Sequence, residues 1–276
     1  MKLGINTLLW TAGFDETHVG LFPRIKAWGF DGVEVATFTV DGFPARTIAR
    51  AARDAGLDIT LCSALTGSLS LIGDNRSAAR DFLKRGIETA AEMDTHLFVG
   101  PFCAPVGQLL GRRRTTDEWR RAVDGLAGLV PDLESHNVTM AIEPLNRFET
   151  YFLNTMADGV DLCKQIGSSR VALLYDTFHT NIEEKDPAAA FTASASHIAH
   201  VHTCENDRGI PGTGHVDWPG LFAAIERAKY DGWLVIESFG FSIPEIAAAA
   251  CIWRDLAANA EDIASEGVRF LRRFLC

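Results

Sequence analysis

Three features are absent from this 276-residue sequence, and each absence excludes a class of protein. No run of about 18 apolar residues occurs, so no segment is predicted to span a membrane. The six cysteines are scattered without a CxxC pair, which indicates reduced thiols rather than a disulfide framework. Basic residues number 26 against 36 acidic ones, and the net charge of −10 disfavours contact with nucleic-acid phosphates.

The beginning of the chain and its composition are those of an ordinary globular protein. The segment MKLGINTLLW has too short an apolar part for a signal peptide and no small-residue cleavage site. Together with the reduced thiols, this predicts a cytoplasmic protein. The sequence is 47% hydrophobic and 22% charged, and it contains no linker-like stretch. We therefore expect a single domain over residues 1–276.

Short apolar runs recur along the chain, and each is followed by a longer amphipathic segment. The predicted strands are Leu3–Asn6, Gly32–Ala36, Ile59–Ser63, Leu97–Gly100, Val138–Glu143, Val171–Asp176, Ile198–Thr203 and Trp233–Glu237. Eight such units with buried strands predict an α/β fold, a single (β/α)8 TIM barrel. An open doubly wound sheet is the alternative, but NTLLWTAG after the first strand is not a glycine-rich phosphate turn.

Acids and a histidine end four consecutive predicted strands, the fifth to the eighth. Glu143, Asp176, His202 and Glu237 stand there, at the end of a barrel that carries the chemistry. One such carboxylate alone is more typical of a cap or a solvated group. All four together suit a divalent cation such as Mn²⁺, Mg²⁺ or Co²⁺, with zinc as an alternative. His200 shares a face with His202 but lies two residues deeper, so we expect a core or supporting role for it.

Three segments of the chain resemble a known enzyme family. The segments IEPLNRFETYFLNT, YDTFHTNIEE and IWRDLA are similar to the ketose 3-epimerases, which act on D-tagatose, D-allulose (psicose) and L-ribulose. These enzymes belong to the xylose-isomerase-like TIM barrel superfamily. The resemblance runs from GFDGVEVA to WRDLAANA, and its specificity comes from the combination of NRFE, DTFHxNIEE and WRDL.

The resemblance implies a role for each residue at the strand ends and in three neighbouring loops. The metal ligands it implies are Glu143, Asp176, His202 and Glu237, and the groups that move the proton are Glu143 and Glu237. The substrate-binding residues it implies are Glu149, His179 and Arg208. Before the resemblance is considered, the alternative for Arg208 is an ion pair with Asp207 or Glu205. The expected cofactor is one Mn²⁺ ion, with Mg²⁺ or Co²⁺ as alternatives, and the expected assembly is a homodimer or homotetramer.

The implied reaction inverts C3 of a free ketose of the D-tagatose, D-fructose/D-allulose or L-ribulose type. One carboxylate removes the C3 proton, the metal stabilises a cis-enediolate, and the second carboxylate returns a proton to the opposite face. The alternatives on the same barrel are aldose–ketose or hydroxypyruvate isomerisation and epimerisation of a modified or phosphorylated sugar. A metal-dependent endonuclease and a non-catalytic sugar-binding protein are further alternatives, and the acidic net charge argues against the endonuclease.

The loop after the fourth strand departs from the family pattern. Relatives often place an aromatic residue there, whereas this chain has PFCAPVGQLLGRRRTT, in which Phe102 is the candidate substitute. Arg112 to Arg114, within loop 111–116, form either a phosphate-binding group or a solvated basic run. Cys204 stands where relatives often carry glycine, beside the end of the seventh strand. These departures leave the identity of the substrate open.

Overall fold

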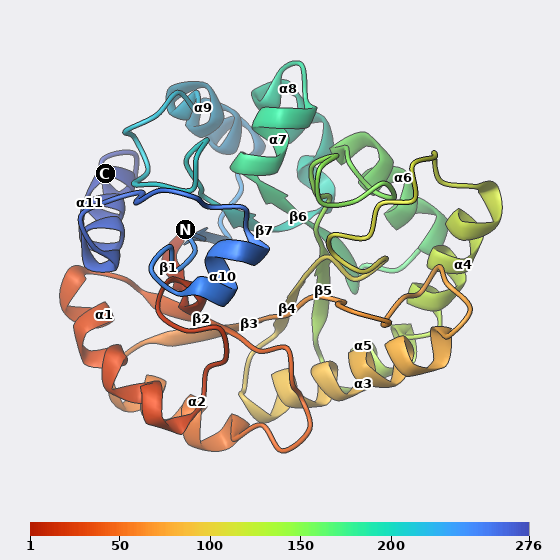
Figure 1. Cartoon of the computed structure of the whole chain (residues 1–276), viewed down its shortest axis with the longest axis horizontal. Helices are drawn as coiled ribbons and strands as arrows, with labels where there is room; N and C mark the ends of the chain where they lie inside the picture. The colour runs from red at the N-terminus through yellow and green to blue at the C-terminus, as the bar shows by residue number, and fades with distance from the viewer. Residues whose placement is uncertain (276) are drawn as a thin grey trace.

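The computed structural model describes residues 1–275, and these residues form one closed barrel of eight parallel strands (Figure 1). The strands are β1 Lys2–Asn6, β2 Gly32–Ala36, β3 Asp58–Cys62, β4 Leu97–Gly100, β5 Thr139–Ile142, β6 Val171–Asp176, β7 Ile198–His202 and β8 Trp233–Ile236. Each strand pairs with its neighbours in chain order, and β8 closes the ring on β1. The predicted (β/α)8 TIM barrel is confirmed, and no predicted strand end is displaced by more than one residue.

Helices surround the barrel and shield the outer faces of the strands (Figure 1). The helices are α1 Phe22–Trp28, α2 Ala45–Asp54, α3 Arg76–Glu92, α4 Thr116–Ala127, α5 Val130–Ser135, α6 Met156–Ile166, α7 Thr177–Glu183, α8 Pro187–Ser194, α9 Trp218–Ala228, α10 Pro244–Ala249 and α11 Ala260–Arg272. Of these, α10 lies across one end of the barrel rather than outside it (Figure 1). In α2, for example, Ile48, Ala49 and Ala52 are buried on one side, as the helical repeat of apolar residues requires. None of the helices among residues 1–275 has the length and apolar content needed to cross a membrane.

The strands are apolar on both faces because helices cover the outside and side chains fill the inside. Inside the barrel, an apolar layer is formed by Leu8, Ala36, Cys62, Val99, Ala141 and Leu174. Polar side chains interrupt this interior at a few positions. The register places Asn6 opposite Glu34 and Glu34 opposite Thr60, so these three polar residues lie side by side on β1, β2 and β3.

All described cysteines are free thiols, as the absence of a CxxC pair predicts. Cys62, Cys103, Cys163 and Cys204 are buried, whereas Cys251 is exposed, and Cys276 lies outside the described residues. Burial raises the pKa of Cys103 to about 12, which keeps its thiol protonated and unreactive at neutral pH.

Candidate active site

Four predicted ligands meet inside the mouth of the barrel. His202 ends β7, Asp176 ends β6, and Glu143 and Glu237 directly follow β5 and β8. His202 Nδ1 lies 3.7 Å from Glu143 Oε1, 3.8 Å from Asp176 Oδ2 and 3.4 Å from Glu237 Oε2. One ligand atom from each of the four residues lies within 4.8 Å of the other three, and all four side chains are buried. The structure therefore brings together the complete ligand set expected from the sequence.

The donor atoms of this group fit a divalent cation. Glu143 Oε1 and His202 Nδ1 are buried and have no hydrogen-bond partner among residues 1–275. Asp176 uses Oδ1 to cap α7 at the backbone N–H of Phe178, which leaves Oδ2 directed at the site. A cation bound at about 2.1 Å holds neighbouring ligand atoms about 3.0–3.4 Å apart, close to the observed spacing. Orphaned donor atoms at this spacing are what a cation would satisfy.

The charges at the site are shifted by burial and by one another. Burial raises the pKa of Glu143 to about 8. Burial also raises the pKa of Asp176, but the charges of Arg208 and His179 lower it by more, so the pKa lies below its ordinary value. Burial lowers the pKa of His202, whereas Glu237 and Glu34 raise it more, so it lies well above its ordinary value. Buried acidic and basic groups in this cluster thus shift one another's pKa values, as expected for closely spaced charges with little access to water.

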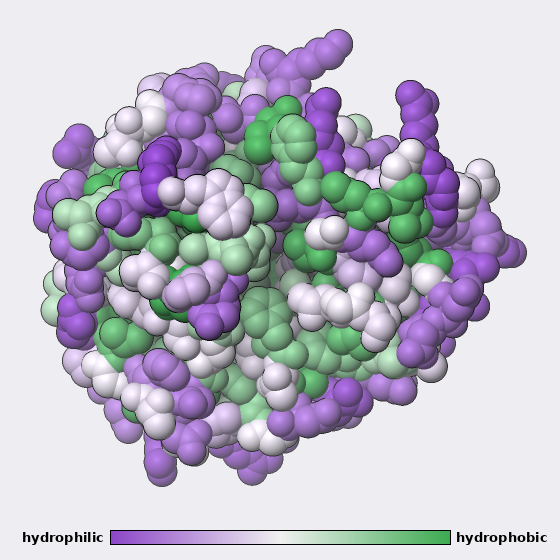
Figure 2. Space-filling view, in the orientation of Figure 1, coloured by the Kyte–Doolittle hydropathy of each residue, from purple (hydrophilic) through white to green (hydrophobic). Residues whose placement is uncertain are grey.

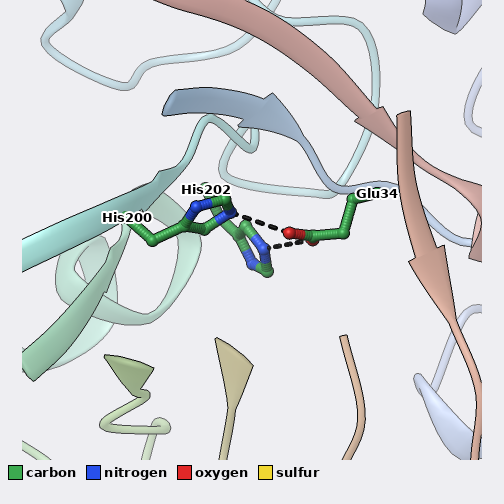
Figure 3. A group of neighbouring side chains, drawn as sticks. All are labelled: Glu34, His200 and His202. Atoms are coloured by element: carbon green, nitrogen blue, oxygen red, sulfur yellow. Dashed lines mark hydrogen bonds and ion pairs between the residues drawn. The ribbon is translucent and has the colours of Figure 1, made fainter. Parts of the chain in front are cut away.

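A second buried cluster lies on the other side of His202, and its central residue, Glu34, is not among the predicted site residues. Glu34 comes from β2, across the barrel from the two histidines of β7 (Figure 3). Its Oε1 lies 2.7 Å from His202 Nε2, and its Oε2 lies 2.8 Å from His200 Nε2. The buried supporting place expected for His200 is observed. The signal for Glu34 was present, because it is the one charged residue in the buried run GVEVA.

His179, predicted to bind substrate, points its Nε2 toward the metal ligands. Nδ1 of its ring accepts hydrogen bonds from the backbone N–H of Asn146 at 3.1 Å and from the Asn146 side-chain amide at 2.9 Å. A neutral imidazole with an accepting Nδ1 carries its proton on Nε2. Nε2 lies 3.5 Å from Glu143 Oε1 and 3.2 Å from Arg208 Nη2. Two donors, from His179 and Arg208, therefore lie close together beside Glu143.

Arg208 is buried among the predicted metal ligands, and the alternative ion pair with Asp207 or Glu205 is wrong. Its Nη1 lies 2.9 Å from Asp176 Oδ2 and 2.8 Å from Glu237 Oε2. The guanidinium lies over the rings of Phe178 and Phe239, with centroid distances of 4.1 and 4.8 Å. These aromatic faces hold the guanidinium of Arg208 by cation–π contact and restrict its movement.

Asp207 and Glu205, the alternative partners of Arg208, contact other residues. Asp207 pairs instead with Arg254 at 2.7 Å. Glu205 is buried and accepts hydrogen bonds from the backbone of Gly212 and from the indole of Trp218. Gly212 has a φ of +91°, and a Cβ there would lie 2.4 Å from the ring of Phe270, so only glycine fits this turn. The loop after β7 is thus folded around Glu205 and delivers Arg208 into the site.

Glu149, the third predicted substrate-binding residue, lies at the entrance of the same site. It is half-buried, and its Oε1 accepts a hydrogen bond of 2.8 Å from the side-chain amide of Asn146. Because the same amide contacts His179, Asn146 links two of the predicted substrate-binding residues. Asn146 is the first residue of the motif NRFE, and only the fold shows that its amide contacts both Glu149 and His179.

A cavity of about 270 Å³ opens above the ligand cluster. Its polar wall is formed by Ser63, Glu143, Glu149, His179, Arg208 and Glu237, and its apolar wall includes Leu8, Phe38, Val106, Leu145, Phe239 and Ile246. α10 lies across this mouth in Figure 1, and Figure 2 shows the same face hollowed near its centre. The hydroxyl of Ser63 is buried and has no hydrogen-bond partner within residues 1–275, so it is a polar group that sequence reasoning missed.

The loop after β4 does not place the aromatic ring of Phe102 over the cavity, as the family pattern would require. Phe102 is fully buried and packs on Phe98 with a ring distance of 4.5 Å, so its proposed place over the substrate is wrong. Arg112 forms two hydrogen bonds with Glu118, and Arg114 forms two with Asp158. Arg112 and Arg114 therefore tie the loop to α4 and α6. Arg112 and Arg113 are nevertheless exposed, which agrees with a solvated basic run more than with a phosphate-binding group.

Cys204 is buried directly beside the ligand cluster. Its Sγ lies 3.5 Å from Asp176 Oδ2 and 2.8 Å from Arg208 Nη1. Burial raises the pKa of this thiol well above its ordinary value, and Asp176 raises it further. The thiol therefore fills space under Arg208 as a neutral group.

Comparison with known proteins places this architecture in a family. Residues 22–274 match the family model described as xylose isomerase-like TIM barrel. A probable ketose 3-epimerase of Synechocystis sp. is 35% identical over 99% of this chain and 96% of its own. A D-psicose 3-epimerase of Agrobacterium fabrum is 29% identical over 95% of this chain and 93% of its own.

A solved structure is similar over nearly the whole chain. The structure of an L-ribulose 3-epimerase superposes with a TM-score of 0.94, at 27% identity, over 99% of this chain and 94% of that one. The fold, the buried group of acids and histidine, and the matched relatives agree with the resemblance found in the sequence. This chain belongs to the xylose isomerase-like TIM barrel family and, within it, to the ketose 3-epimerases, which are enzymes of the isomerase class.

Proposed function

We propose that this protein inverts C3 of a free ketose of the D-tagatose, D-fructose/D-allulose or L-ribulose type. The observation that carries the proposal is the convergence of Glu143 and Glu237 on one buried point, where His202 and Asp176 complete a cation-binding set below the cavity. The relatives named above are a probable ketose 3-epimerase, a D-psicose 3-epimerase and an L-ribulose 3-epimerase, which supports the same reaction for this chain.

In the proposed reaction, Glu143 and Glu237 act on opposite faces of the sugar. They extend from β5 and β8, which are separated by β6 and β7 in the barrel. One carboxylate removes the C3 proton as a general base, and the other, in its protonated form, donates a proton to the opposite face. A divalent cation held by Glu143, Asp176, His202 and Glu237 would act as a Lewis acid toward the ketose oxygens.

The substrate-binding residues would hold the sugar oxygens during this transfer. The Nε2–H of His179 and the guanidinium of Arg208 are donors directed at the same place, so they would bind an oxygen that becomes negatively charged. Glu149 is an acceptor at the entrance and would hold a sugar hydroxyl. The apolar wall near Phe38 and Ile246 would exclude water and prevent loss of the transferred proton.

Proton NMR in D₂O tests the reaction directly. D-Tagatose, D-fructose and L-ribulose are incubated separately with the Mn²⁺-loaded protein, and deuterium at each carbon is measured. We expect a C3 epimer with deuterium at C3, and the fastest sugar identifies the preferred ketose. An aldose product with exchange at C1 and C2 would contradict the proposal and indicate an isomerase. Exchange only with a phosphorylated or otherwise modified ketose would move the substrate to that class.

The ion, the assembly and the compartment are also part of the proposal. We propose Mn²⁺ as the ion, because mixed carboxylate and imidazole ligands suit it, with Mg²⁺ and Co²⁺ as competitors in the same binding assay. We propose a homodimer or homotetramer, supported by the exposed Phe148 and Trp253 on loops at the barrel mouth. Light scattering of the purified chain measures the assembly. The buried free thiols support a reducing, cytoplasmic compartment.

A further inference from the structure

The second buried cluster, in which Glu34 contacts His200 and His202, is called the lower cluster here. It has no role in the proposed proton transfer, although its polar groups are fully buried. The neighbouring residues Asn6 and Thr60 both donate to the Glu34 carboxylate, at 2.9 Å to Oε1 and 3.0 Å to Oε2. His200 and His202 approach the same two oxygens from β7, as Figure 3 shows. No more than 1% of any of these residues is exposed. Burying these polar groups costs free energy, and the hydrogen bonds from Asn6, Thr60 and His202 to Glu34 offset part of that cost.

The hydrogen bonds fix which nitrogen of His202 carries the proton. Asn6 Oδ1 accepts from the backbone N–H of Leu8, so the amide orientation is set and Nδ2 must donate to Glu34 Oε1. A carboxylate only accepts, so the 2.7 Å contact requires a proton on His202 Nε2. A histidine that ligates a metal is neutral and has one N–H, so with the proton on Nε2 the lone pair available to a cation lies on Nδ1. That nitrogen is the one directed at the three carboxylates.

The spacing of the lower cluster excludes a second metal ion there. Its N–O distances are 2.7 and 2.8 Å, whereas two ligands of one ion with bonds of about 2.1 Å lie about 3.0–3.4 Å apart. Both oxygens of Glu34 are, in addition, already occupied by donors from Asn6 and Thr60. The cluster is a hydrogen-bonded support for the site above it.

We propose that Glu34 is a positioning residue that holds His202 in its Nε2–H tautomer and so presents Nδ1 to the divalent cation. The inference rests on the metal site of the proposed function. Hydrogen bonding between a ligating histidine and a carboxylate orients the ring and increases the basicity of the ligating nitrogen. Glu34 thus acts on the metal through His202, without contact with the sugar or with any of the three carboxylate ligands.

Three variants separate this role from simple loss of packing. Glu34→Met removes the acceptor, and we expect Mn²⁺ binding measured by titration calorimetry to weaken about 10- to 100-fold. Glu34→Gln is the conservative variant, because its carbonyl can face His202 while its amide donates to the Thr60 hydroxyl, so affinity recovers to within about tenfold of the wild type. Thr60→Val removes one hydrogen bond to Glu34 but leaves the His202 contact, and Mn²⁺ affinity stays within about twofold.

Wild-type affinity in folded Glu34→Met, or an equal loss of affinity in Thr60→Val, would overturn the proposal. Histidine ¹⁵N NMR of the Mg²⁺-loaded wild type needs no variant and remains decisive if Glu34→Met does not fold. We expect the His202 signal to report a protonated Nε2, and a proton on Nδ1 would contradict the inference. Failure of the wild type to bind any divalent cation would instead refute the proposed metal site, so the two failures are distinguishable.

Discussion

The two nitrogens of His202 face two buried clusters of the same composition, acids and histidine. On the Nδ1 side, the distances to three carboxylates are 3.4 to 3.8 Å, and two of the facing atoms have no hydrogen-bond partner within residues 1–275. On the Nε2 side, Glu34 lies at 2.7 Å and receives further donors from Asn6 and Thr60. Residue type therefore does not separate a cation cage from a hydrogen-bonded support. Ligand spacing and the number of available donors separate them.

The same comparison explains why the two clusters occupy different depths. The Nδ1 cluster lies at the carboxyl ends of the strands, where the cavity of about 270 Å³ gives a sugar access. The Nε2 cluster lies one layer deeper, among residues that are fully buried. Layers of side chains fill the interior of a barrel. A deep polar layer can therefore form hydrogen bonds to residues at the mouth, but it cannot contact a substrate.

The largest expected effect comes from replacing the two glutamates that are proposed to transfer the proton. Glu143→Gln and Glu237→Gln each remove a carboxylate, and we expect kcat for C3 epimerisation to fall about 10²- to 10⁴-fold. The measurement is product formation from the preferred ketose at saturating Mn²⁺. Glu226→Gln on the exposed face of α9 makes the same chemical change away from the mouth and serves as the control. Retention of more than about one tenth of kcat in either variant would exclude a role in proton transfer.

An intermediate effect is expected from the same substitution at the two histidines of β7. His202→Gln removes a ligand, so Mn²⁺ affinity falls by more than about 100-fold, whereas His200→Gln leaves the His202–Glu34 contact and weakens binding less than about tenfold. Both variants lose some stability because each histidine is fully buried. Calorimetric titration with Mn²⁺, together with thermal unfolding in EDTA and in Mn²⁺, measures both. Equal loss of affinity in the two variants would remove the distinction between the clusters.

The smallest effect is expected at the ion pairs of the loop after β4. These ion pairs are partly exposed, in contrast to the two buried clusters at His202. The hydrogen bond from Arg112 lowers the pKa of Glu118 from 4.5 to about 2, despite partial burial. A lowered pKa in the folded state stabilises the protein above pH 4.5, and this contribution disappears as the pH falls from 4.5 to 2. Because Arg112 is 47% exposed, solvent screening limits the effect of Glu118→Gln on the free energy of unfolding to about 1 kcal/mol at pH 7.

Urea unfolding of the wild type and of Glu118→Gln between pH 7 and pH 3 measures this contribution. The difference between the two proteins should shrink as the pH decreases, and a difference that grows would show that the pair does not act as described. Activity on free ketoses should change less than about threefold, since Arg112 and Arg114 contact protein carboxylates rather than the cavity. A selective loss of activity on a phosphorylated ketose would restore the phosphate interpretation of this loop.

The sequence by itself determined the barrel and the cluster of predicted metal ligands at its mouth. Eight apolar runs at barrel spacing predicted β1 to β8, because parallel strands covered on both faces leave a continuous apolar signal. Glu143, Asp176, His202 and Glu237 were found because a barrel brings all carboxyl strand ends to one face, so position along the chain fixes position in space. The motifs then suggested roles for Glu149, His179 and Arg208.

Only the tertiary structure decided which atoms meet. Glu34 joins His202 from 168 positions away, and Asn6 and Thr60 join them through strand register, which no single strand encodes. The pairing of Arg112 and Arg114 and the inward packing of Phe102 likewise depend on α4, α6 and β4. The physical reason is that strand periodicity fixes which face a side chain occupies, whereas its partner is fixed by closure of the ring and by packing across it.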